Sequence, residues 1–150
     1  KTPSVEMSIY GLESSLSLIV FSIPVLCLSI IGVDNDFSIQ PNLFGLFIGI
    51  FTLVYASFEE FGWRGYLQEE FRSRSKKWFG YLFVGIMWYL WHWYFLRSPS
   101  NPKFTIVPIL ILSSIGIGEV ARLTKSIIVC GALHGLANIL FVYPVVSHGI

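Results

Sequence analysis

The sequence predicts an all-α protein, a polytopic transmembrane bundle of about five spanning helices. Apolar residues make up 54% of the chain and charged residues only 13%, whereas about 25% of the residues of an average soluble domain are charged. The apolar residues gather in long runs, such as residues 16–32 and 106–117, which a soluble domain of this size has too little core to bury. No segment alternates between polar and apolar side chains as the strands of a membrane barrel do, so helices are expected to cross the bilayer.

Five apolar segments are long enough, or nearly so, to cross the roughly 30 Å of a bilayer's hydrocarbon core as helices. They are expected at residues 12–32, 43–68, 79–97, 104–119 and 126–147. Pro41 opens the second segment, at the start of a helix, where proline is tolerated. The chain shows no repeat and no linker, so a single membrane-embedded domain over residues 1–150 is expected. Because it begins with Lys1 rather than Met, it is interpreted as a segment of a longer protein.

Charged residues mark the boundaries between these segments. Residues 34–36 are interpreted as a polar turn and residues 69–77 as a solvated loop. Glu119, Arg122 and Lys125 are interpreted as the polar boundary between the last two segments.

The basic residues divide unequally between the two membrane faces that this arrangement defines. One face would carry seven of them, Lys1, Arg72, Arg74, Lys76, Lys77, Arg122 and Lys125. The other would carry Arg97 and Lys103. By the positive-inside rule the face with more basic residues is cytoplasmic, which places the amino end inside and the carboxyl end outside. The net charge of +1 and the lack of a basic stripe argue against nucleic acid as a partner.

Glu59, Glu60 and Arg64 lie inside the otherwise apolar second segment. A charge near the middle of a bilayer costs about 2.5 to 3.5 kcal/mol on insertion scales, so an intramembrane charge cluster is a candidate functional site. On a helix Glu60 and Arg64 share a face, while Glu59 is turned by about 100°. Arg64 can therefore neutralise Glu60 and leave Glu59 available.

The remaining polar residues within the apolar segments are His92 on the third and His134 and Asn138 on the fifth. His134 and Asn138 are four residues apart, so both can project into one cavity. If neighbouring helices are antiparallel, Glu59, His92 and His134 fall at similar depths in the membrane. His92 also belongs to the aromatic run at residues 88–95, for which an interfacial belt is the alternative interpretation.

Small residues are expected to let the helices approach closely. Gly45 and Gly49 form one Gly-x-x-x-Gly pattern, and Gly131 and Gly135 form another. Such patterns permit close backbone packing in lipid. By contrast, the two cysteines lack the spacing of a metal site and are interpreted as small buried apolar residues.

Three short motifs occur in order on separate segments: Glu59-Glu60-x-x-x-Arg64, an aromatic-x-x-x-His motif from Trp88 to His92, and His134-x-x-x-Asn138. Together they resemble the motifs of the CPBP family of intramembrane proteases, also called the Abi or type II CAAX prenyl endopeptidase family. The resemblance covers residues 59–138. Trp88 departs from the family pattern, which usually has Phe at this position, and this difference concerns packing rather than chemistry.

The resemblance implies an intramembrane endopeptidase that hydrolyses a peptide bond of a membrane-associated or prenylated protein or of a leader peptide. Glu59, assisted by His92, would hold and deprotonate a water molecule. His134 and Asn138 would donate hydrogen bonds to the oxyanion of the tetrahedral intermediate. The protein would be a multi-pass protein of a bacterial plasma membrane, with bilayer lipid and a peptide or protein substrate as partners.

The sequence alone does not decide whether the site holds a metal ion. Glu59, His92 and His134 form a plausible set of ligands for one divalent metal such as zinc, but the chain lacks the His-Glu-x-x-His helix that would indicate zinc strongly. The remaining pair, Glu60 and Arg64, would organise the second helix.

Two other functions compete with the protease. A non-proteolytic membrane scaffold or a bacteriocin self-immunity protein of the same family is the alternative, and the presence of every expected polar residue favours the protease. A transporter or proton relay also uses intramembrane Glu and His, but inverted repeats would then be expected, and the sequence shows none.

Overall fold

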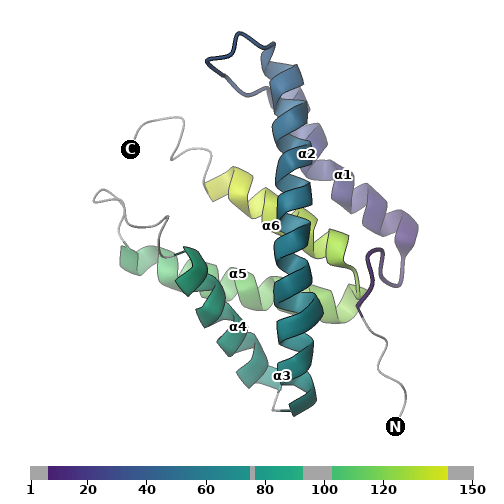
Figure 1. Ribbon diagram of the computed structural model, residues 1–150, viewed down its shortest axis with the longest axis vertical. Coiled ribbons are helices and arrows are strands. Elements are labelled where there is room, and N and C mark those ends of the chain that lie inside the picture. The colour runs from purple at the N-terminus through teal and green to yellow at the C-terminus, as the bar shows by residue number, and fades with distance from the viewer. Residues whose placement is uncertain (1–6, 75–76, 93–102, 142–150) are drawn as a thin grey trace.

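The chain forms a helical bundle over the residues that the computed structural model describes, which are 7–74, 77–92 and 103–141. The elements are α1 (Ser14–Ile31), α2 (Pro41–Glu60), the π-helix η1 (Phe61–Gln68), α3 (Glu69–Arg74), α4 (Lys77–His92), α5 (Lys103–Thr124) and α6 (Ile127–Phe141). Figure 1 shows α2, η1 and α3 running in one line through most of the length of the molecule, with α1 on one side, α4 on the other, and α5 and α6 crossing behind. The predicted all-α class is confirmed.

Three described stretches are long and apolar enough to cross a membrane, namely Ser14–Ile31, Pro41–Phe71 and Val107–Thr124. Large apolar side chains such as Ile19 and Phe58 are exposed on the outer faces of α1 and α2. A continuous apolar surface of this kind suits contact with lipid rather than with water. The chain is therefore a membrane protein, as its composition predicts.

The second predicted segment, residues 43–68, belongs to a longer helical stretch. In the structure α2, η1 and α3 follow one another without a break from Pro41 to Arg74. The interpretation of residues 69–77 as a loop is wrong for residues 69–74, which form α3, and for Lys77, which begins α4; residues 75 and 76 lie outside the described residues. The charged side chains of residues 69–74 indicate contact with water. However, Glu and Arg are good helix formers, and residues 69–74 contain no glycine or proline.

Helix α5, which corresponds to the fourth predicted segment, also passes the predicted end at residue 119 and continues to Thr124. Two contacts explain how the polar residues fit on it: the Tyr81 hydroxyl donates to Glu119 at 2.8 Å, and Arg122 pairs with Glu119 at 2.7 Å. The predicted ends of the third and fifth segments, at residues 93–97 and 142–147, lie outside the described residues.

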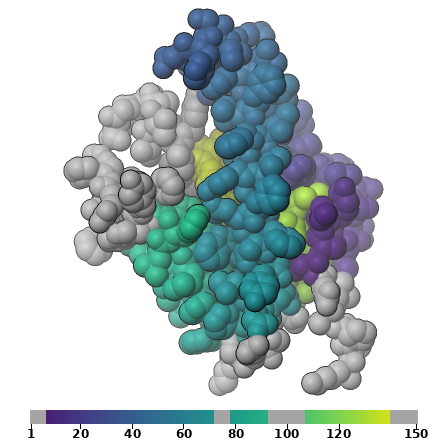
Figure 2. All heavy atoms as spheres, in the orientation of Figure 1, coloured from purple at the N-terminus to yellow at the C-terminus, as the bar shows by residue number. Residues whose placement is uncertain are grey.

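The glycine patterns bring helices together, as predicted. A Cβ atom on Gly49 of α2 would lie 2.9 Å from the Cα atom of Val25 on α1, and a Cβ atom on Gly131 of α6 would lie 3.0 Å from the Cα atom of Ser57 on α2. Only glycine permits backbones to approach this closely. As a result α6 lies deep in the bundle, and Figure 2 shows it only in patches between α2 and its neighbours.

A segment before α1 is tied to the turn between α5 and α6. The Ser8 amide donates to the Lys125 carbonyl at 2.9 Å, and the Ile127 amide donates to the Ser8 carbonyl at 3.0 Å. Lys125 also forms an ion pair of 3.7 Å with Glu69 at the start of α3. The segment before α1, the α5–α6 turn and α3 therefore lie at one end of the bundle, as expected for segments predicted to share a membrane face.

Candidate active site

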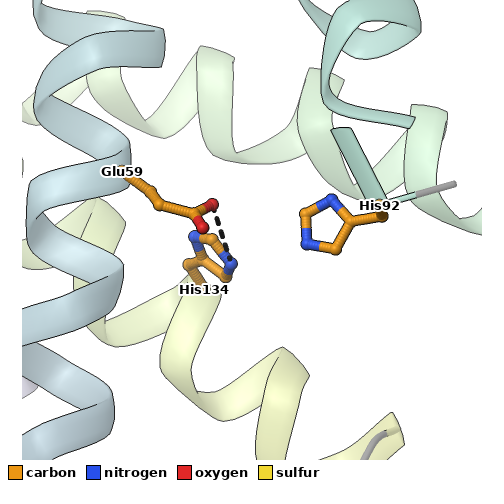
Figure 3. Close-up of side chains that lie close together, drawn as sticks. All are labelled: Glu59, His92 and His134. Carbon is orange, nitrogen blue, oxygen red and sulfur yellow. Dashed lines mark ion pairs between the residues drawn. The ribbon is translucent and has the colours of Figure 1, made fainter. Parts of the chain in front are cut away.

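Three helices bring one carboxylate and two imidazoles together inside the bundle. Glu59 lies in the last turn of α2, His92 at the end of α4 and His134 within α6. One ligand atom of each lies within 4.8 Å of the others. Figure 3 shows Glu59 and His134 side by side, with His92 facing them across a gap. The Nε2 atom of His134 is 3.9 Å from the Oε2 atom of Glu59.

Glu60, the next residue after Glu59, forms a fully buried ion pair with Arg64. The Nη1 atom of Arg64 donates to Glu60 Oε1 at 2.7 Å, and neither side chain is exposed. The same oxygen, Glu60 Oε1, lies 2.9 Å from the Nδ1 atom of His134. The predicted pairing of Glu60 with Arg64 is thus present, and Glu60 additionally orients an imidazole of the site.

Arg64 is itself held by two other helices. Its Nη2 atom donates to the carbonyl and to the hydroxyl of Ser114 on α5, at 3.1 Å and 2.9 Å. Its guanidinium lies over the ring of Trp88 on α4, 5.3 Å from the ring centroid. Arg64 therefore joins α4, α5 and η1 around Glu60, and its charge is balanced within the bundle, where it could not otherwise lie buried.

Both histidines are oriented through their Nδ1 atoms. His92 Nδ1 lies 2.8 Å from the Trp88 carbonyl oxygen, which can only accept, so this nitrogen carries a hydrogen. His134 Nδ1 lies 2.9 Å from Glu60 Oε1, an oxygen that also accepts from Arg64, so Nδ1 is assigned as the donor of this contact. When the imidazoles are neutral, each Nε2 atom is left with a lone pair, available as a base or as a metal ligand.

Five polar atoms of the site are buried and have no hydrogen-bond partner within the described part of the chain: Glu59 Oε2, Glu60 Oε2, Arg64 Nε, Trp88 Nε1 and His134 Nε2. Two of them, Glu59 Oε2 and His134 Nε2, face each other at 3.9 Å. Buried polar atoms are almost always paired with protein or with ordered water. The pair therefore suits a bound water molecule or, with His92, a cation held by one carboxylate and two imidazoles.

Five of the six residues that the sequence singles out lie in this cluster: Glu59, Glu60, Arg64, His92 and His134. The sixth, Asn138, is partly exposed and lies one turn beyond His134 on α6. No hydrogen bond joins its side chain to the cluster among the described residues. The aromatic-belt interpretation is wrong for Trp88, which is 2% exposed and lies edge-on to both histidine rings, at 5.0 Å and 5.1 Å.

Sequence reasoning misses four side chains around the cluster. Trp91 donates its indole N–H to Glu59 at 3.2 Å, and the Tyr55 hydroxyl interacts with the same carboxylate. Ser114 holds Arg64, and Gln68 donates to the Gly118 carbonyl at 3.0 Å. Tyr55 and Gln68 each lie four residues from a residue already singled out, so helical spacing could have revealed both.

Comparison with protein families matches residues 41–140 to the family described as type II CAAX prenyl endopeptidase Rce1-like. No curated protein and no solved structure matches the chain. The matched range contains every helix that contributes to the cluster, from α2 to α6, and it confirms the resemblance seen in the three motifs. The chain therefore belongs to the type II CAAX prenyl endopeptidase Rce1-like family, a family of proteases.

Proposed function

We propose that the protein is an intramembrane endopeptidase that hydrolyses a peptide bond of a membrane-associated or prenylated protein or of a leader peptide. One observation carries the proposal: two buried atoms without partners, Glu59 Oε2 and His134 Nε2, face each other at 3.9 Å within a chain of a protease family. The proposal treats residues 1–150 as one domain, a multi-pass protein of a bacterial plasma membrane.

In the proposed reaction a water molecule between Glu59 and His134 donates one hydrogen to each of these acceptors. Glu59 removes a proton as the water oxygen attacks the scissile carbonyl carbon, and positioned bases of this kind contribute about 10² to 10⁴ in rate. The tetrahedral intermediate then collapses, the C–N bond breaks, and Glu59 returns the proton to the departing amine. His92 faces the pair from α4 and helps to hold the water.

These roles differ from the initial expectation for His134, which was to donate to the oxyanion. Its Nδ1 hydrogen is directed at Glu60 at 2.9 Å, so a neutral His134 offers a lone pair toward Glu59 rather than a donor. We assign the oxyanion donor to the amide of Asn138, one turn along α6. This assignment rests on the position of Asn138 on the same helix and on its donor chemistry.

The same residues fit a divalent metal such as zinc. Glu59, His92 and His134 would be the ligands, and the metal would supply a Lewis acid and a bound water that ionises near neutral pH. Histidines that bind zinc usually donate their other ring N–H to a carboxylate or a carbonyl. Both histidines here do so, His134 to Glu60 and His92 to the Trp88 carbonyl.

The first test separates Glu59 from Glu60. Glu59→Gln keeps the size of the side chain and removes its basicity, so cleavage should fall by about 10² to 10⁴ while the fold survives. Glu60→Gln breaks the ion pair with Arg64 and leaves a buried cation, which typically costs about 3 to 5 kcal/mol of stability. Cleavage of candidate membrane substrates would be followed in cells, with protein level and thermal stability of each variant measured alongside.

The two variants control for each other, because they change neighbouring carboxylates in the same way. A well-folded Glu59→Gln protein with unchanged biological activity would contradict the protease mechanism. It would support instead a scaffold or a bacteriocin self-immunity protein of the same family.

A further inference from the structure

The two oxygen atoms of the Glu59 carboxylate have different surroundings. Oε1 accepts a hydrogen bond of 3.2 Å from the indole N–H of Trp91, on α4. Oε2 is buried, has no hydrogen-bond partner among the described residues, and faces His134. The two oxygens of a carboxylate are equivalent, so the contact with Trp91 fixes the plane of the group and the direction in which its second oxygen points.

Trp91 is itself supported from the helix that follows Glu59. Its ring packs edge-on against Trp63 of η1, with centroids 6.5 Å apart and the planes at 69°, an arrangement that aromatic pairs favour. Trp91 is 55% exposed, so burial alone does not explain its position. The Trp91 indole thus contacts both the Trp63 ring and the Glu59 carboxylate.

Tyr55 approaches the same carboxylate from within α2. It lies one helical turn before Glu59, on the same face, and its hydroxyl interacts with the Glu59 carboxylate. Side chains from two helices, α2 and α4, thus approach one carboxylate, and the indole N–H of Trp91 donates to it. Because charged acceptors form stronger hydrogen bonds than neutral ones, the bond from Trp91 is well suited to fix the orientation of Glu59.

We propose that Trp91 is a positioning residue, assisted by Tyr55, that holds Glu59 so that Oε2 faces His134 and the reacting water. The inference rests on the proposed role of Glu59 as the base. Trp91 directly precedes His92 on α4, so the end of this helix sets both the second imidazole and the orientation of the carboxylate. Neither Trp91 nor Tyr55 takes part in proton transfer.

The test replaces Trp91 with Phe in the full chain, which removes the N–H and keeps an aromatic ring against Trp63. We expect kcat to fall roughly ten-fold to a hundred-fold, the worth of one hydrogen bond to a charged group, with KM changed less than about two-fold, because uniform binding of substrate is untouched. Tyr55→Phe should lower kcat in the same sense, and by less. Trp78→Phe is the matched control, since Trp78 lies on the same helix about 20 Å from Trp91, and it should leave kcat and KM unchanged.

The outcomes distinguish this inference from the proposed function. Loss of activity in Glu59→Gln together with unchanged kcat in Trp91→Phe overturns the positioning role and leaves the protease mechanism standing. Activity that survives in Glu59→Gln overturns both. A fall in kcat for Trp91→Phe that is matched by a lower thermal midpoint and by a similar fall in Trp78→Phe would show a general packing defect and also overturn the inference.

Discussion

At the scale of single residues, Arg64 is the side chain that connects the buried groups around Glu60. It contacts Glu60, Ser114 and the ring of Trp88, and through Glu60 it fixes the imidazole of His134. A lysine would keep the charge but not the planar group that reaches several partners at once.

Arg64→Lys should therefore destabilise the protein although the charge is preserved. The bonds from Nη2 to Ser114 would be lost, and one hydrogen bond to a charged group is worth about 1.5 to 3 kcal/mol. Chemical unfolding in detergent measures the loss. The matched control is Arg122→Lys, since the pair of Arg122 with Glu119 is 37% exposed on both sides and should matter much less. Equal stability of the two variants would contradict the central role of Arg64.

At the scale of elements, η1 is the unusual part of the bundle. It starts directly after Glu60 and supplies both Arg64 and Gln68, whose side chains bind backbone carbonyls of α5 at Ser114 and Gly118. Segments with π-helical i to i+5 hydrogen bonds are rare and occur frequently at functional sites. The wider turn is therefore found where α2 must present polar groups to a neighbouring helix.

The contact between α2 and α6 gives a prediction at the same scale. Gly131→Ala would place a Cβ atom 3.0 Å from the Cα atom of Ser57, and backbone cannot move aside as a flexible side chain can. Overpacking of this kind typically costs about 1 to 3 kcal/mol. Because His134 lies one turn further along α6, cleavage activity should fall with stability.

Gly116→Ala is the control for this change. Gly116 is also helical, on α5, but a Cβ atom there would meet no heavy atom within 4 Å. It should leave activity unchanged and raise helix stability by up to about 1 kcal/mol. Thermal midpoints and cleavage rates of both variants provide the measurement. A tolerated Gly131→Ala would show that α2 and α6 do not pack this closely.

Contacts at helical spacing were predictable from the sequence, and contacts between helices were not. Glu60 pairs with Arg64 because residues four apart on a helix are neighbours, and the glycine patterns marked the surfaces where helices meet. The partnership of Arg64 with Ser114 and that of Glu59 with Trp91 join different helices and depend on how those helices cross. The π-helical turn was also hidden, since over eight residues its apolar pattern resembles that of an α-helix.

At the scale of the whole molecule, the distribution of basic residues predicts how the bundle sits in the membrane. In a variant with both native cysteines replaced by alanine, a cysteine at Ser73 should react with an impermeant thiol reagent only from the cytoplasmic side. A cysteine at Asp36, which is exposed in the loop after α1, should react only from the outside. The reason is the excess of Lys and Arg on the face that includes α3. Labelling in the opposite sense would reverse the predicted orientation.

The central position of α6 has a consequence for the biosynthesis of the protein. Helices emerge from the ribosome in order, and chains generally fold from their amino end as they are made. Glu59, Glu60 and Arg64 are thus in the membrane before His134 has been translated. Since α6 must then enter between helices that are present earlier, Glu59 and His134 come together only when this last described helix docks. Under the mechanism proposed above, a chain that is still being synthesised therefore lacks the pair of side chains that holds the reacting water.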